Sequence, residues 1–198
     1  MSSYSRSADE SYELTSEPIL DQRFRNLPLA IQNEFNQLSE TAETNGAAAI
    51  PRLLELLEKY PLPLIYSCLA IAYGRVDAEK QKQIIRENYQ KNPKNLFARC
   101  NYARLCLAED NLAEIPLIFD QKFELKTLYP KRNQFHVTEY TALTSVFCEY
   151  YFKSGNSEQA EALYTRLKEA MPDSAETLLM QELLHPTFWQ KVQQKYFA

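Results

Sequence analysis

Apolar residues recur every three or four positions along most of the chain after Leu29, which is the spacing of an α-helix with one buried face. Turn-forming residues interrupt this pattern near Gly46, Gly74, Asn111 and Gly155. No run of four to eight residues alternates as a strand does, so we predict an all-α fold. The predicted helices lie at about 29–43, 47–60, 63–73, 77–91, 95–108, 111–128, 135–153, 157–171 and 174–184.

The two ends of the chain differ from this helical middle. Residues 1–27 are rich in serine and charge and show little periodicity, so we expect a flexible or loosely docked N-terminal arm. The helical domain is predicted over 28–185. Residues 186–198 are aromatic and form the third predicted segment.

Four prolines each follow the second helix of a predicted pair: Pro61, Pro93, Pro130 and Pro172. The differences between these residue numbers are 32, 37 and 42. A period in the thirties, built from two helices and a turn, is the signature of a helical solenoid. Proline suits these positions because it cannot continue a helix but can begin the next one.

One stretch, 141–174, carries a small residue and then an aromatic on its first helix, the same pair on its second helix, and a closing proline. These residues are Cys148, Tyr151, Ala160, Tyr164 and Pro172. The arrangement resembles the tetratricopeptide repeat, a pair of antiparallel helices about 34 residues long. The resemblance implies a right-handed superhelical solenoid of three to four repeats with a C-terminal capping helix.

The other repeats depart from this pattern. The unit at 63–95 has Gln81 where alanine is expected, and the unit at 96–130 keeps Ala103 and Phe119 but has Pro116 in its second helix. The extra sequence KRNQFHVTEY, 131–140, lengthens the last interval. Either helix 111–128 is extended or a longer loop precedes the next helix, and both would change the stacking of the repeats.

The resemblance also implies a function. Stacked hairpins form a concave surface from their first helices, and this surface binds a peptide segment or helix of another protein. Asn101 is suited to pair with a bound peptide backbone, and Arg104 with a carboxylate. The positions expected in this partner-binding groove are Phe97, Asn101, Arg104, Leu107, Glu149, Phe152 and Lys153.

The aromatic C-terminal segment has two interpretations. In the first interpretation, the segment caps the last repeat, whose apolar face would otherwise be exposed to solvent. Alternatively, Trp189 and Phe197 form an exposed anchor for a partner or a second copy.

Composition narrows the range of partners. The net charge of −4 disfavours a nucleic-acid binder, which needs a basic surface. The longest uncharged run, Pro61 to Gly74, is too short to span a bilayer, and no secretion signal precedes it. We therefore expect a cytoplasmic protein without a membrane partner, and buried, reduced thiols at Cys68, Cys100, Cys106 and Cys148.

Catalytic and metal-binding patterns are weak. His136 and Glu139 are three residues apart, on one helical face, but no close Cys or His pair accompanies them as zinc sites require. A histidine that caps or packs at a helix start explains this pair better. The three glycines stand alone in turns, so there is no phosphate-binding loop.

We therefore predict a non-catalytic interaction module or assembly adaptor without cofactors. Two alternatives stay open. One is a small acidic chaperone that shields an apolar segment of one client, because some secretion chaperones are built from three such repeats. The other is an enzyme or metal protein that uses His136, Glu139 and the nearby thiols. The sequence does not indicate an oligomeric state.

Overall fold

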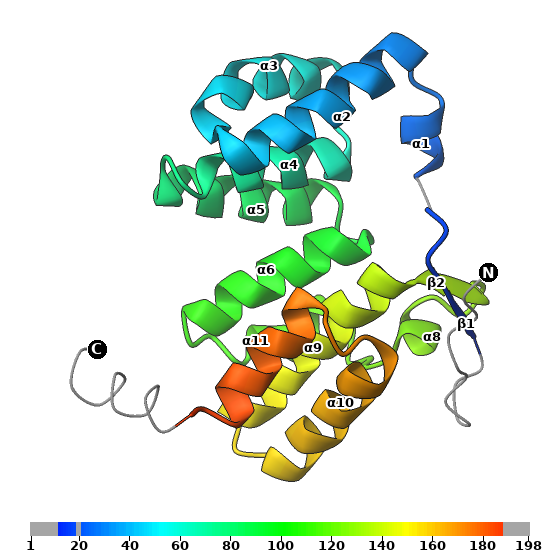
Figure 1. The fold of residues 1–198 in the computed structure, drawn as a ribbon, viewed down its shortest axis with the longest axis vertical. Helices are drawn as coiled ribbons and strands as arrows, with labels where there is room; N and C mark the ends of the chain where they lie inside the picture. The colour runs from blue at the N-terminus through cyan, green and yellow to red at the C-terminus, as the bar shows by residue number, and fades with distance from the viewer. Residues whose placement is uncertain (1–11, 19–20, 188–198) are drawn as a thin grey trace. The chain divides into compact units, whose positions relative to one another are not determined.

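The computed structural model describes residues 12–18 and 21–187, which contain eleven helices and two short strands (Figure 1). Among these residues the chain forms two compact units. The N-terminal unit comprises 21–105, and the C-terminal unit comprises 12–18 together with 106–187. This division differs from the predicted arm, repeat domain and tail, because residues 12–18 join the distant C-terminal half.

The N-terminal unit is a set of packed helices: α1 (Gln22–Arg25), α2 (Leu29–Thr44), α3 (Gly46–Lys59), α4 (Pro63–Tyr73), α5 (Ala78–Lys91) and most of α6 (Leu96–Ala108). Helix α2 packs against α3 and α4, α3 against α4, and α4 against α5. Helix α4 is central, and Ile65, Tyr66 and Leu69 on it are almost fully buried. Its uncharged sequence is therefore explained by burial among helices.

Local signals set the ends of these helices. Pro63 begins α4, where its missing N–H removes no helical hydrogen bond. The carboxylate of Asp77 caps α5 by accepting from the backbone N–H of Lys80 at 3.0 Å. At the start of α3, Gly46 touches the backbone of α4, and a Cβ at this position would lie 2.1 Å from the carbonyl oxygen of Ala72.

The C-terminal unit contains α7 (Glu114–Ile118), α8 (Leu125–Leu128), α9 (Val137–Lys153), α10 (Ser157–Ala170) and α11 (Ala175–Leu184). Helix α9 packs against α10 and α11, and α10 packs against α11. Gly155, at a φ of 83°, turns the chain between α9 and α10. The thiol of Cys148 on α9 donates to the carbonyl of Ala160 on α10 at 3.3 Å, so two small residues hold these helices close.

Most of the predicted helices are confirmed to within two residues at each end, and 63–73 has the predicted bounds. The continuous helix predicted at 111–128 is wrong. The chain forms α7 and α8 instead, separated by Asp120 and Gln121, whose φ values of 54° and 59° are left-handed. Two consecutive residues in this conformation end a right-handed helix, and aspartate tolerates it better than most side chains.

The predicted all-α class is supported, because most of the described residues are helical, but two short strands accompany the helices. Strand β1 (Glu13–Thr15) pairs in parallel with β2 (Gln134–His136), and Leu14 lies opposite Phe135. Strands of three residues are too short to leave an alternating pattern in the sequence. The described part of the predicted arm is therefore packed: β1 joins the C-terminal unit, and Phe24 of α1 is buried against Phe35 in the N-terminal unit.

Candidate functional site

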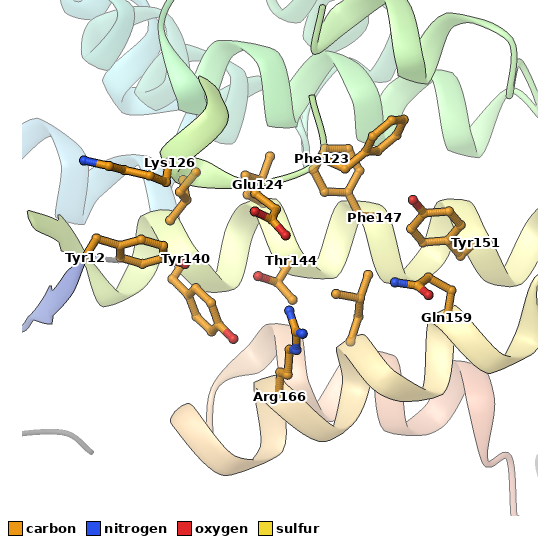
Figure 2. Close-up of a pocket in the computed structure, with 13 residues that line it drawn as sticks. Tyr12, Phe123, Glu124, Lys126, Tyr140, Thr144, Phe147, Tyr151, Gln159 and Arg166 are labelled. Carbon is orange, nitrogen blue, oxygen red and sulfur yellow. The ribbon is translucent and has the colours of Figure 1, made fainter. Parts of the chain in front are cut away.

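The C-terminal unit has a pocket of about 370 Å³ (Figure 2). It lies between the segment 123–126, the side of α9 and the adjacent face of α10, and Tyr12 borders it next to β1. The remaining side chains that line it are Phe123, Glu124, Leu125, Lys126, Tyr140, Leu143, Thr144, Phe147, Tyr151, Gln159, Leu163 and Arg166.

Helical spacing on α9 forms one wall of the pocket. Tyr140, Thr144, Phe147 and Tyr151 are four, three and four residues apart, so they share one side of the helix. The ring of Phe123 lies 5.1 Å from that of Phe147 and 6.1 Å from that of Tyr151. Burial raises the pKa of the Tyr151 hydroxyl above its ordinary value, with a smaller contribution from Tyr150. This wall is thus an aromatic surface with hydroxyl groups at its edge.

Two opposite charges face each other across the pocket. Figure 2 shows Glu124 and Arg166 pointing from opposite walls toward Thr144. In the described part of the chain neither the Glu124 carboxylate nor the Arg166 guanidinium forms an ion pair with a neighbour. By contrast, the ammonium of Lys126 donates to the carbonyl of Arg132 at 2.9 Å. The pocket therefore combines an aromatic wall with one carboxylate and one guanidinium that form no ion pair among the described residues.

A charged cluster stands beside the pocket at the start of α9. The guanidinium of Arg132 donates to both carboxylate oxygens of Glu139, at 2.9 and 2.7 Å, and lies 4.3 Å from the ring centre of Phe135. Glu139 also accepts from the backbone N–H of His136 at 2.9 Å. The ring of His136 accepts from the backbone N–H of Thr138 at 3.2 Å, which completes a capping box.

His136 and Glu139 are thus brought together as the sequence suggested, and they form a helix cap. Both oxygens of Glu139 are occupied by Arg132, and one of them also by the helix start. Over residues 12–18 and 21–187, no three His, Cys, Asp or Glu residues are grouped so as to hold a metal ion. The two residues therefore have a structural role as a helix cap, which is the preferred interpretation of the sequence.

The four cysteines are confirmed as buried, and none of them is in a disulfide. Burial raises the pKa of Cys148 to about 12 and that of Cys68 to about 11, with smaller contributions from nearby glutamates. None of the cysteines lines the pocket. Thiols in such surroundings stay protonated and are poor nucleophiles.

The predicted groove residues fall into both units. Phe97 is 37% exposed, and Asn101 and Arg104 are half-buried on the same helix, α6, within the N-terminal unit. Leu107 has no exposed area, so its expected contact with a ligand is contradicted by its burial.

The other predicted groove positions belong to α9. Phe152 is 37% exposed, Glu149 is half-buried, and the ammonium of Lys153 lies 3.9 Å from the carboxylate of Asp110. Along α9 these residues alternate with the last residues of the pocket wall, but they do not line the pocket. Trp189 and Phe197 lie outside the described residues.

Sequence reasoning missed the pocket. The aromatic residues of α9 have the spacing of a core face, and nothing in the sequence separates pocket from core positions. The one usable signal was the irregular unit at 96–130, because a broken second helix leaves a neighbouring hairpin partly uncovered. Arg166 gave no signal at all, since a single arginine on an exposed helix is ordinary.

Within the described ranges, no helix has the length and apolar character needed to cross a membrane. Comparison with known proteins finds no match to a family model, to a curated protein or to a solved structure.

Proposed function

We propose that the chain is a degenerate tetratricopeptide-like array and acts as a non-catalytic protein-interaction module or assembly adaptor. The packing of the helices supports the repeat. In the N-terminal unit, α4 packs against both helices of the preceding pair, α2 and α3. In the C-terminal unit, α11 packs against both helices of the pair α9 and α10. A repeated hairpin stacks in this way because each new first helix covers the pair before it.

Residues at the diagnostic positions support the same proposal. Ala49 on α3 and Ala160 on α10 have no exposed area, and each stands four residues before a large buried side chain, Leu53 or Tyr164. Close helix contact requires a small side chain at the first position, and the larger one fills the space between helices. Two hairpins far apart in the sequence thus use the same device.

The pocket is the observation that carries the functional proposal. Its aromatic wall suits an inserted apolar side chain of a peptide segment. Glu124 and Arg166 form no ion pair among the described residues and suit polar groups of the same segment. Arg166 is suited to a carboxylate of the partner. We place this binding in the cytoplasm, because four buried cysteines that form no disulfide are typical of a reducing compartment.

A chaperone for a single client is the second candidate. On α11, Leu178 and Leu179 are 50% and 54% exposed, and exposed leucines of this kind suit an apolar client segment. The two roles differ in the partner: a client would be insoluble when expressed without this chain, whereas an adaptor's partner would fold independently.

The test is selection of binders from a displayed library of short random peptides on the full chain. We expect enriched peptides whose affinity falls at least about tenfold in Leu163→Trp, because the larger side chain fills the pocket. Ala162→Trp is the matched control, since Ala162 is the exposed neighbour on α10 and does not line the pocket. Circular dichroism checks that both variants fold. Enriched peptides that bind the two variants equally well, or no enrichment, would refute the proposal.

A further inference from the structure

The segment 12–16 is seated on the C-terminal unit in the manner of a bound peptide. It reaches its partner strand across more than a hundred residues of sequence and runs parallel to it. The backbone N–H of Glu13 donates to the carbonyl of Asn133 at 2.9 Å. At the other end, the imidazole of His136 donates from Nε2 to the carbonyl of Ser16 at 3.2 Å. Both bonds are made to the main chain of the segment, and bonds of this kind hold any extended segment with little regard to its sequence.

One side chain of the segment makes an aromatic contact with residues 133–136, which are called the seat below. The ring of Tyr12 packs edge-to-face on Phe135, with 5.0 Å between the ring centres, and it also borders the pocket. Phe135 has no exposed area, and the guanidinium of Arg132 lies over its ring. An aromatic residue just before the strand therefore meets an aromatic surface that is already in place.

The seat and the segment are held with unequal strength. Phe135 and Val137 are buried, and the capping box of His136 and Glu139 fixes the backbone of the seat. No side chain between Tyr12 and Pro18 is buried; each is half-buried or exposed. Helix α9 packs against both strands, but the side chains of the segment contribute little to the core, whereas Phe135 and Val137 belong to it.

We propose that the seat formed by 133–136 is a binding site for an extended segment of a partner protein, and that residues 12–16 are a tethered competitor for it. The partner segment has an aromatic residue, then any residue, then an apolar residue and a threonine, as in Tyr12-Glu13-Leu14-Thr15. It pairs in parallel with β2 and places its aromatic ring at the edge of the pocket. This inference rests on the proposed protein-binding function and names the chemistry of the partner.

A tethered segment competes at an effective concentration on the order of millimolar. A free peptide of the same sequence therefore binds the wild-type chain weakly and binds more tightly when the tethered segment is weakened. The probe is the peptide SYELTSEP, the sequence of Ser11 to Pro18, with a fluorescent label. The control peptide has alanine in place of its tyrosine and aspartate in place of its leucine.

Two full-length variants control whether residues 12–16 occupy the seat. Tyr12→Ala with Leu14→Asp weakens the tethered segment and leaves β2 intact. Glu13→Cys with Gln134→Cys locks it, because these residues are exposed and lie opposite each other in register. The four native thiols are buried and do not interfere. Reduction of the lock restores the unlocked chain in the same sample.

We expect fluorescence anisotropy to show at least about tenfold tighter binding of the probe to the weakened variant than to the wild type. We also expect no binding to the oxidised lock, a return of binding on reduction, and no binding of the control peptide. Equal binding to the weakened and wild-type chains, or undiminished binding to the oxidised lock, overturns the proposal. A disulfide between two chains also overturns it, because the occupant would then be the segment of a second copy.

The two proposals fail in different ways. Library peptides that lose affinity in Leu163→Trp but still bind the oxidised lock would support the pocket and refute the seat. Binding of the probe that ignores Leu163→Trp but disappears in the oxidised lock would support the seat without the pocket.

Discussion

Gly46→Ala tests the close packing of α3 on α4, which is one of the contacts that support a stacked repeat. Gly46 is the first residue of α3 and is buried. An added Cβ would lie 2.1 Å from the carbonyl oxygen of Ala72, 2.9 Å from its carbonyl carbon and 3.0 Å from its Cα. All three are backbone atoms, so no side chain can turn aside, and α3 itself must move.

The size of the effect follows from that overlap. Ordinary contact begins at 3.4 Å, so the gap of 2.1 Å must widen by 3.4 − 2.1 = 1.3 Å. Overpacking that displaces backbone costs about 1–3 kcal/mol, and the better helix propensity of alanine offsets at most about 1 kcal/mol. We expect Gly46→Ala to lower the free energy of unfolding by about 2 kcal/mol, and Tm by roughly 4–8 °C for a chain of this length.

The assay is urea and thermal unfolding followed by circular dichroism, with Gly74→Ala as the matched control. Gly74 has helical backbone angles (φ −56°, ψ −23°), and an added Cβ would meet the amide of Gln81 at 2.7 Å. That side chain is flexible, so Gly74→Ala should leave stability unchanged or raise it by up to about 0.5 kcal/mol. If Gly46→Ala were as stable as the wild type, α3 and α4 would not be packed as closely as described, and the reasoning would be refuted.

Two further predictions concern buried groups. Glu139→Gln should lower the free energy of unfolding by about 2 kcal/mol in urea titrations, because it removes the ion pair with Arg132 and the charged acceptor at the start of α9. The exposed Glu169→Gln is the control and should change the free energy of unfolding by less than about 0.5 kcal/mol. Equal effects of the two substitutions would contradict the structural role of Glu139. For Cys148, burial places the pKa of the folded state, about 12, above the unfolded value of 9.0. The contribution of the buried, protonated thiol to the free energy of unfolding is complete below about pH 9 and is lost as pH rises toward 12. Unfolding midpoints measured across this range should therefore fall more steeply for the wild type than for Cys148→Ala. Parallel curves for the two proteins would refute the assignment.

Much of the fold was predictable because its signals are local. The bounds of most helices follow from apolar spacing and from turn residues a few positions away, and α4 was predicted at 63–73 as observed. Gly155 and the caps at Asn156 and Ser174 act within one helical turn. The burial of the thiols was also predictable, because Cys100, for example, lies within an apolar helical stretch.

The candidate site was not predictable from the same signals. Whether Leu107 or Phe97 reaches the surface depends on neighbours that the helical period does not specify, and only Leu107 is fully buried. Asp120 and Gln121 break a stretch whose spacing is helical, because a periodic pattern indicates which side chains prefer burial but not whether the backbone between them stays helical.

The sequence by itself determined the helical class, the hairpin turns and the small residues that let paired helices meet. Each of these rests on hydrogen bonds and side-chain contacts between residues close along the chain. Only the tertiary structure decided that residues 12–16 join β2, that Glu124 and Arg166 face the same pocket, and that His136 caps α9 while it holds Ser16. The longest of these contacts join segments about 120 residues apart, and their free energy depends on how whole elements pack.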